Sequence, residues 1–352
     1  MELAPVFTGG GITIAQIVEI ACAAELAGAS SLYVTEAWRS GFVPLTAVAA
    51  ATKRIKLGPY VLNAYGRSPL LTGMSAIDFN EYSGGRLILG VGGGNRIINE
   101  EWQGIAHARV LTKMAEYVEL LKRMARTRLG GRIDFEGKIH RMHWAPAVDP
   151  GATPYPVYLA AVFPEMLKVA ARVADGIACG ATLSAAYLRD VVRPLVATTA
   201  RAAGRDPAAL RWKAVGFVAI DDDRERARRA AREAICHLYA PLPHPYYEFT
   251  MREQGYAKTV DALLTLAPAG RTEAAIDAIP DEVVDRLVIA GTPAECRARL
   301  TEYVGVVDEM LLLNAMPTPD NIVASYAPLI GLIRAFSSAS RITGTESLKS
   351  RA

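Results

Sequence analysis

The chain has 352 residues, of which 51% are hydrophobic and 21% charged, and its 39 basic and 36 acidic side chains leave a formal net charge of +3. This apolar content excludes an intrinsically disordered chain, and the near balance of charge argues against a nucleic-acid-binding protein. The cysteines lie far apart and in no metal-binding or disulfide spacing, so we expect no metal, four reduced thiols and a cytoplasmic protein; they are Cys22, Cys179, Cys236 and Cys296.

Neither end of the chain carries a membrane or export signal. No run approaches the ~20 apolar residues that a bilayer requires. The N-terminus lacks the charged and apolar regions of a signal peptide. We therefore expect no membrane partner.

In the first half of the chain, short apolar runs alternate with helical patterns. The runs predict strands at 3–7, 31–35, 55–62 and 87–91. Helices are predicted at 13–28, 42–52, 69–83 and 106–127, with Gly28 as a stop and Pro69 at a start.

The same alternation continues in the second half. Strands are predicted at 157–160, 176–179, 212–220 and 311–313. Helices are predicted at 164–173, 185–203, from the acidic cap at 221–223 to 239, from Thr292 onward and at 320–336. Thr292 is a suitable N-cap because Pro293 and Glu295 follow it.

Eight strand–helix units predict an α/β fold, a (β/α)8 TIM barrel formed as one domain by residues 1–336. A doubly wound open sheet is the alternative, although six strands would be more usual for it. The segments 128–153 and 241–290 do not fit the alternation and are expected to be insertions. Residues 337–352 are rich in Ser, Thr and Lys and are expected to form a flexible tail.

Polar and glycine-rich segments follow four of the predicted strands, where the active site of such a barrel lies. They are 35–39, 63–68, 92–96 and 180–182. Their glycines would let a ligand approach the backbone closely, and we expect that ligand to be flat, polar and anionic. The run Gly90-x-Gly92-x-x-Asn95 lacks the third glycine of a nicotinamide fingerprint and follows the fourth strand, which argues against a Rossmann site.

An ordered series of short motifs resembles the luciferase-like monooxygenase superfamily, in its F420-dependent branch. The motifs are Ala24-Glu25-Leu26-Ala27-Gly28, Leu32-Tyr33-Val34-Thr35-Glu36, 51–58, Arg67-Ser68-Pro69, 83–92, Phe135-Glu136-Gly137-Lys138, 156–161, 174–177 and 292–295. The resemblance implies a barrel that binds the deazaflavin coenzyme F420 or reduced FMN.

The resemblance also implies the residues that contact the cofactor. A backbone bulge at Tyr60 and Val61 would press against the central ring of F420, and Asn63 would reach its polar edge. Asn99 resembles a coenzyme-holding asparagine, with Asn95 as its competitor because the spacing is one residue longer. Glu36 takes the place of an acidic cofactor contact. Backbone N–H groups in the segment Cys179, Gly180, Ala181 and Thr182 would hold the phosphate of the tail.

One position departs from the family pattern. Ala37 stands where the family commonly has a histidine that transfers protons, so we expect neither sugar-phosphate dehydrogenase nor light-emitting activity. Glu36, Tyr65 and Asn95 are left as candidate catalytic residues, and Trp38 and Arg67 as walls of the substrate pocket.

These observations predict an F420-dependent oxidoreductase that exchanges a hydride with a small organic substrate. The first alternative is an FMN-dependent monooxygenase supplied by a separate reductase. The second is a non-catalytic flavin-binding barrel, which the absence of the histidine would favour. The family implies a homodimer.

Overall fold

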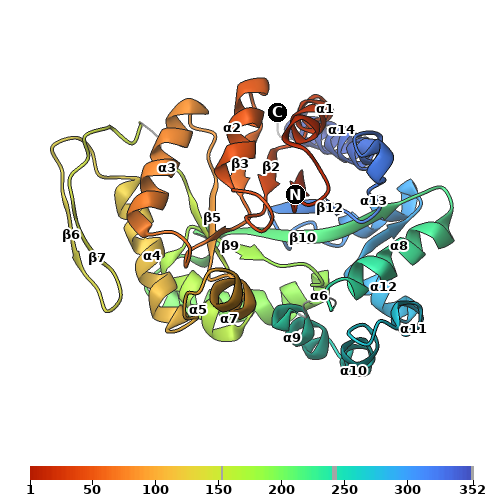
Figure 1. Ribbon diagram of the computed structural model, residues 1–352. Coiled ribbons are helices and arrows are strands. Elements are labelled where there is room, and N and C mark those ends of the chain that lie inside the picture. The colour runs from red at the N-terminus through yellow and green to blue at the C-terminus, as the bar shows by residue number, and fades with distance from the viewer. Residues whose placement is uncertain (152–153, 240–243, 350–352) are drawn as a thin grey trace.

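The computed structural model describes residues 1–151, 154–239 and 244–349, and it shows a mostly parallel sheet that curls into a nearly closed barrel (Figure 1). The strand order around the barrel is β3-β2-β1-β12-β10-β9-β8-β5-β4, and β11 pairs with β10. The strands are β1 Glu2–Phe7, β2 Ser31–Val34, β3 Lys56–Pro59, β4 Leu62–Asn63, β5 Leu89–Gly92, β8 Val157–Ala160, β9 Gly176–Cys179, β10 Arg211–Ile220, β11 Ile289–Gly291 and β12 Glu309–Asn314.

The two ends of this strand order meet. Only Tyr60 and Val61 separate β3 from β4, so the two are halves of the single strand predicted at 55–62. Leu57 also forms a parallel bridge to Leu87, beside β5. The sheet therefore curls into a TIM-barrel-like α/β fold, which confirms the predicted fold class against the open sheet.

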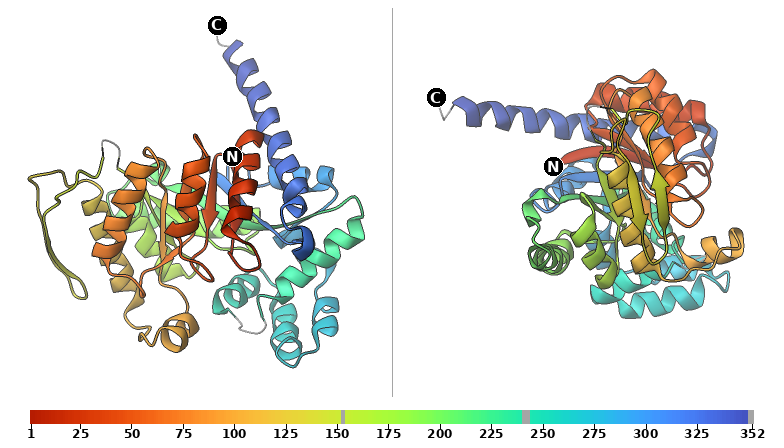
Figure 2. Two further views of the ribbon diagram at one scale, coloured as in Figure 1. Left: turned by 45° about the horizontal axis from the view of Figure 1, so that its top comes forward. Right: turned by 90° about the vertical axis from the view of Figure 1, so that its left-hand side faces the viewer.

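Helices surround the barrel and bury their apolar faces against it (Figures 1 and 2). In the order of the chain they are α1 Ile14–Ala27, α2 Phe42–Ala51, α3 Pro69–Tyr82, α4 Val110–Met124, α5 Pro164–Val173, α6 Ala185–Tyr187, α7 Arg193–Ala202, α8 Arg224–Cys236, α13 Pro293–Thr301 and α14 Ala327–Lys349. Short π-helical turns occupy Ile98–Trp102 and Leu188–Val192, and 3-10 turns occupy Pro207–Ala209, Pro319–Asn321 and Ala324–Tyr326.

Local signals in the sequence set several helix ends where they were predicted. Thr292 and Glu295 form a reciprocal capping box at the start of α13. Asp223 accepts hydrogen bonds from the first N–H groups of α8. Gly28 ends α1 in the left-handed conformation, with a φ of 93°.

Some predicted helix boundaries were wrong, and the last predicted helix, 320–336, begins only at Ala327, after two 3-10 turns. The helix predicted from residue 106 begins at Val110, because Arg109 adopts a left-handed conformation with a φ of 52°. The helix predicted to end at residue 336 continues as α14 to Lys349. Its last turns project from the barrel (Figure 2), so this part of the helix needs no apolar stripe in its sequence.

The two predicted insertions contain elements of their own. The first carries an antiparallel hairpin, β6 Ile133–Glu136 and β7 Arg141–Trp144. The second carries four helices, α9 Pro245–Glu253, α10 Ala257–Leu266, α11 Thr272–Asp277 and α12 Asp281–Leu287, which form an apolar cluster with α8. The second insertion starts at residues 241–243, which lie outside the described residues.

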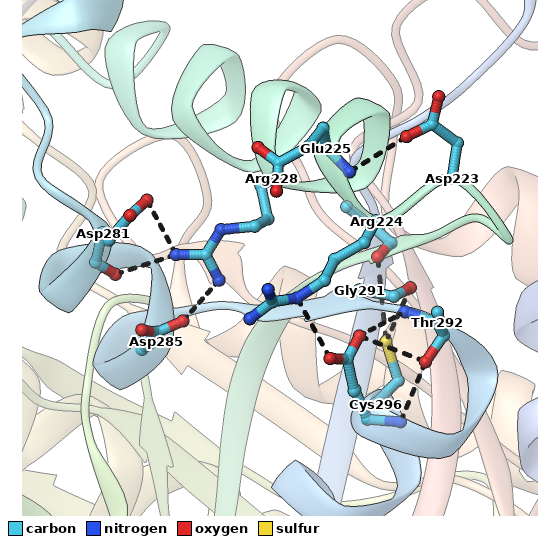
Figure 3. Close-up of polar contacts among 11 residues, drawn as sticks. Asp223, Arg224, Glu225, Arg228, Asp281, Asp285, Gly291, Thr292 and Cys296 are labelled. Atoms are coloured by element: carbon cyan, nitrogen blue, oxygen red, sulfur yellow. Dashed lines mark hydrogen bonds and ion pairs between the residues drawn. The ribbon is translucent and has the colours of Figure 1, made fainter.

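A buried arginine ties the second insertion to the barrel. Arg228 of α8 lies between Asp281 and Asp285 of α12, with ion-pair distances of 2.8 and 2.5 Å (Figure 3). Close by, Arg224 of the same helix reaches Glu295 of α13 at 3.0 Å (Figure 3). These charge-assisted hydrogen bonds satisfy a guanidinium that is 4% exposed. The basic stretch 224–232 therefore fixes helices to one another.

In the part of the chain that the structure describes, no helix is long and apolar enough to cross a membrane.

Candidate active site

A cavity of about 480 Å³ opens at the carboxyl ends of the barrel strands. Most of its wall is apolar, with Val6, Val61, Ala160, Val162, Val215, Phe217 and Leu313 among the contributors. The polar groups come mainly from the loops after β2, β4 and β5 and from the start of α9; they include Glu36, Asn63, Asn95, His107, His244 and Tyr246. A mostly apolar cavity with a few convergent polar groups is typical of a site for a small molecule or a cofactor.

The floor of the cavity includes the interruption between β3 and β4. The peptide bond between Tyr60 and Val61 is cis, at the place where the resemblance implies a bulge. The Tyr60 hydroxyl donates to the backbone oxygens of Cys179 at 2.8 Å and Lys213 at 3.2 Å, and burial raises its pKa well above the ordinary value. Tyr60 thus fastens this segment to β9 and β10 across the barrel.

Glycine is required beside this segment. A Cβ placed on Gly92 would lie 2.7 Å from Cγ2 of Val61 and 3.1 Å from Cβ of Ala160. A Cβ on Gly94, whose φ is 61°, would lie 2.7 Å from Nδ2 of Asn63. Glycines at these positions keep the floor open and let the loop after β5 approach the strand.

Glu36 and Asn63 belong to one hydrogen-bonded network. The carboxylate of Glu36 accepts from the backbone N–H of Asn63 at 3.1 Å and pairs with Arg67 at 3.2 Å. Nδ2 of Asn63 donates to Oδ1 of Asn99 at 2.8 Å. Asn99 is fully buried behind the lining, whereas Asn95 lines the cavity itself.

Besides Asn99 and Thr182, three other candidates from the sequence lie outside the lining. Tyr65 is buried, and its hydroxyl donates to the backbone oxygen of Ala108 at 2.7 Å. Arg67 is held by Glu36 rather than directed into the cavity. Trp38 is 66% exposed and packs on Trp102, with ring centroids 5.3 Å apart. The structure therefore does not place the predicted substrate walls, Trp38 and Arg67, at the cavity.

The segment after β9 forms another part of the wall. Cys179, Gly180 and Ala181 line the cavity, while Thr182 lies just behind it with a left-handed φ of 62°. The Thr182 hydroxyl is 3.1 Å from that of Thr250 in α9, so the second insertion supports this loop. Burial raises the pKa of the Cys179 thiol to about 12, which makes it an unreactive wall group.

The sequence analysis missed several lining residues, of which His107 and His244 carry the most chemistry. Nδ1 of His107 is 2.7 Å from Nδ2 of Asn99, and Nδ1 of His244 is 3.0 Å from Nδ2 of Asn95. Burial lowers the pKa of both imidazoles, and for His107 the positive charge of Arg96 adds to the effect. The proline- and aromatic-rich run at 241–247 was the only signal for His244.

A buried ion pair lies inside the barrel, where Nζ of Lys213 is 5.3 Å from the ring centroid of Tyr33 and 5.0 Å from that of Tyr158. Lys213 of β10 pairs with Glu309 of β12, and these residues are 5% and 1% exposed. Glu309 also accepts hydrogen bonds from the hydroxyls of Ser30, Ser31 and Tyr33. The sequence analysis also missed this pair, because Lys213 and Glu309 lie in different strands, 96 positions apart.

The model of the family described as luciferase-like monooxygenase matches residues 3–309. The chain belongs to this family. It is an oxidoreductase of the luciferase-like superfamily, and the resemblance inferred from the ordered motifs is confirmed.

Among its curated relatives, this luciferase-like protein is 30% identical to the 5,10-methylenetetrahydromethanopterin reductase of Archaeoglobus fulgidus, over 79% of this chain and 83% of that one. Solved structures share the fold. The coenzyme F420-dependent tetrahydromethanopterin reductase of Methanopyrus kandleri matches with a TM-score of 0.77 and 20% identity, over 92% of this chain and 96% of that one. The FMN-bound oxygenating component of a Baeyer–Villiger monooxygenase from Pseudomonas putida matches with a TM-score of 0.68 and 16% identity, over 96% and 97%.

Proposed function

We propose that this chain is an F420-dependent oxidoreductase that exchanges a hydride with a small organic substrate. The observation that carries the proposal is the cavity itself, whose mostly apolar walls and few polar groups suit a flat ring system with a polar edge. The 30% identical archaeal reductase supports the choice of reaction class. Bound in this cavity, the deazaflavin would accept or donate a hydride at its C5.

The residues fit such a group at three places. The segment Tyr60–Val61 and the glycines of the loop after β5 would support the face of the ring, because no side chain there fills the floor. Asn63 and Glu36 would hold the polar edge from their shared network. The loop Gly180–Thr182 would hold the phosphate through backbone N–H groups.

The remaining lining orients the substrate and limits the access of water. Phe217, Val215 and Leu313 form an apolar wall, and Tyr246 closes part of the mouth by donating its hydroxyl to the backbone oxygen of Gly94. Exclusion of water strengthens the electrostatic interactions inside the site and prevents side reactions, so it is a contribution the barrel makes. The substrate that suits these walls is largely apolar.

The second candidate is an FMN-dependent monooxygenase. The shared fold of the FMN-bound Baeyer–Villiger component favours it, because that structure places a flavin on the same kind of barrel. Both cofactors are flat anionic ring systems, and both would use the same walls.

Fluorescence titration of the purified protein with F420 and with FMN tests the choice. We expect tight binding of F420, a weaker response to FMN, and affinity for F420 reduced about tenfold in Asn63→Ala, which corresponds to roughly 1.4 kcal/mol. Asn321→Ala, at an exposed 3-10 turn, is the matched control. Tight FMN binding without a response to F420 would support the monooxygenase instead.

Hydride exchange is the second measurement. The F420-loaded protein is offered cyclohex-2-en-1-one, 1-pyrroline and 2-propanol, which represent an activated C=C bond, a C=N bond and a secondary alcohol. A change in coenzyme absorbance with any of the three supports the proposal. Binding of F420 with no exchange would support the non-catalytic barrel.

A further inference from the structure

Two imidazoles line the cavity, and each is held by an asparagine side chain of the loop that follows β5. For His244 the partner is Asn95. Oδ1 of Asn95 accepts from the backbone N–H of Ile98 at 2.8 Å, which fixes the amide so that its NH₂ group faces Nδ1 of His244 at 3.0 Å. An NH₂ group only donates, so Nδ1 must accept and the neutral ring carries its proton on Nε2.

The same arrangement occurs at His107. Oδ1 of Asn99 accepts from Nδ2 of Asn63 at 2.8 Å, and its NH₂ group donates to the backbone oxygen of Gly93 at 2.8 Å. Its other donor faces Nδ1 of His107 at 2.7 Å. Both rings are therefore held as neutral imidazoles with N–H at Nε2. A proton on Nδ1 would point at the NH₂ group of the asparagine, so that two donors would face each other.

Burial acts in the same direction as this geometry. It lowers the pKa of both rings. The titratable groups that share the cavity wall with His244 are Glu36, Tyr60, His107, Glu165, Cys179, Tyr246 and Tyr247. The two carboxylates have cations of their own, because Glu36 pairs with Arg67 at 3.2 Å and Glu165 with Lys168 at 2.5 Å. Burial raises the pKa of Tyr246 to about 12 and of Tyr247 above its ordinary value, so neither phenol supplies a negative charge that would favour imidazolium at neutral pH.

The two histidines belong to different parts of the cavity. His107 joins the network of Glu36, Asn63 and Asn99, and its ring packs on Tyr65 with centroids 5.0 Å apart. His244 comes from the second insertion, beside α9, where its ring contacts Tyr247 at 5.7 Å and Tyr246 packs on Phe163 at 5.7 Å. The first group is the proposed coenzyme edge, so the second faces the space left for the substrate.

We infer that His244 is a catalytic residue that donates a hydrogen bond from Nε2–H to the acceptor atom of the substrate, and that Asn95 is the positioning residue that fixes this tautomer. This inference rests on the proposed function. It assigns the substrate to compounds in which a carbonyl or imine activates the carbon that receives the hydride. The donor takes the role for which the family position, Ala37, offers no hydrogen-bonding side chain.

In the reductive direction, reduced F420 bound in the cavity would supply a hydride from its C5 to the substrate carbon, so that the coenzyme would be oxidised and the substrate reduced. The π pair of the double bond moves toward the oxygen or nitrogen that His244 contacts, and that charge develops against the Nε2–H donor. Oxidation of the coenzyme would release one proton besides the hydride, and this proton would complete the product, so the imidazole would keep its own proton.

Nitrogen NMR of the coenzyme-free protein tests the tautomer directly. In ¹⁵N-labelled protein, we expect the His244 ring to show a protonated Nε2 and an unprotonated Nδ1 at pH 7, with signals assigned by their absence in His244→Phe. A proton on Nδ1, or a charged ring at pH 7, would overturn the inference. This measurement needs neither coenzyme nor substrate, so it does not depend on the proposed function.

Asn95→Asp is the variant that separates positioning from packing. Its carboxylate has nearly the same shape as the amide but only accepts, so the neutral His244 ring should move its proton to Nδ1 and its pKa should rise. Asn321→Asp, at the exposed turn, should leave the His244 signals unchanged. An unshifted tautomer in Asn95→Asp would remove Asn95 from the positioning role.

Reduction of cyclohex-2-en-1-one by the protein loaded with reduced F420 tests the catalytic role. His244→Phe should lower kcat/KM about 10²-fold, the usual loss for one such donor, with F420 affinity unchanged. His244→Gln, which keeps an N–H donor, should retain activity to within about tenfold. The exposed His237→Phe, at the end of α8, is the control.

The pH dependence of kcat/KM separates the proposed roles of His244 and Asn95 from a purely structural one, which would leave this dependence unchanged. For the native protein, kcat/KM should be flat near neutral pH, because the neutral ring donates throughout. In Asn95→Asp it should fall as pH rises through the new pKa of His244, because the neutral ring then presents an acceptor at Nε2. Three outcomes would each overturn the catalytic assignment of His244. They are equal pH profiles for the native protein and Asn95→Asp, a loss of F420 affinity in His244→Phe, and no turnover by native protein that binds F420. Failure of the native protein to bind F420 would instead refute the proposed function.

Discussion

The carboxylate of Glu36 accepts a hydrogen bond from the backbone N–H of Asn63 at 3.1 Å, and so joins the loop after β2 to β4 across the mouth of the barrel. Its other oxygen accepts from the backbone N–H of Gly41 and pairs with Arg67, both at 3.2 Å. Glu36, which the family resemblance assigns to cofactor contact, thus also holds two loops together through its hydrogen bonds. The two roles can be separated by substitution.

Glu36→Ala removes both carboxylate oxygens that accept these hydrogen bonds, so we expect F420 affinity to fall about tenfold or more, which is roughly 1.4 kcal/mol or more. Glu36→Gln keeps an oxygen for one of the N–H donors and should lose less. Fluorescence titration of both variants measures the difference. Equal affinity of Glu36→Ala and the native protein would show that the coenzyme site does not need the hydrogen bonds of Glu36.

Gly92→Ala should damage the floor of the cavity. The new Cβ would lie 2.7 Å from Val61 and 3.1 Å from Ala160, so the cis segment or β8 must shift. Overpacking of this kind typically costs about 1–3 kcal/mol. Gly331→Ala is the matched control, because a Cβ there meets nothing within 4 Å and lies in helix α14. Urea denaturation of the two variants, together with F420 titration, should show losses in Gly92→Ala alone.

The sequence predicts the frame of this molecule well because its signals are local. Strands β8 and β9 were predicted residue for residue, and the predicted caps at Asp223 and Thr292 each depend on side chains within three positions of the helix start. Alternation of short apolar runs with helices then leaves few arrangements other than a barrel.

The site was less predictable because its contacts join distant segments. His244 meets Asn95 across 149 positions, and Lys213 meets Glu309 across 96. No local pattern marks such pairs, and a histidine after a proline-rich run looks like a surface loop. The sequence also placed two residues in the pocket wall that lie outside the lining. Trp38 and Arg67 each follow a strand that ends at the cavity, but neither lines it.

The buried pair of Lys213 and Glu309 gives a stability prediction. Lys213→Met would leave the Glu309 carboxylate buried without its cation, which typically costs about 3–5 kcal/mol. The double variant Lys213→Met/Glu309→Gln removes both charges and should be more stable than Lys213→Met alone. Denaturation midpoints of the single and double variants form a cycle that measures the coupling. Additive losses would show that the two residues act independently.

Acid sensitivity should depend on Glu25, whose carboxylate accepts from the backbone N–H groups of Lys53, Arg54 and Ile55 at 3.0, 2.6 and 3.1 Å. Burial alone would raise the pKa of Glu25, but these three donors and the charge of Arg54 lower it overall. A folded-state pKa below the unfolded value of about 4.3 means that the carboxylate stabilises the fold above that pH and that this stabilisation is lost as the pH falls through the folded-state pKa.

Glu25→Gln removes the titrating group while keeping an oxygen acceptor. The difference in unfolding free energy between the native protein and Glu25→Gln should therefore be largest near pH 7 and shrink below about pH 4. Glu19→Gln, an exposed position on the same helix α1, controls for the change in net charge. Urea denaturation at a series of pH values measures both differences. A gap that stays constant from pH 7 to pH 3 would show that the three backbone donors do not favour the ionised carboxylate.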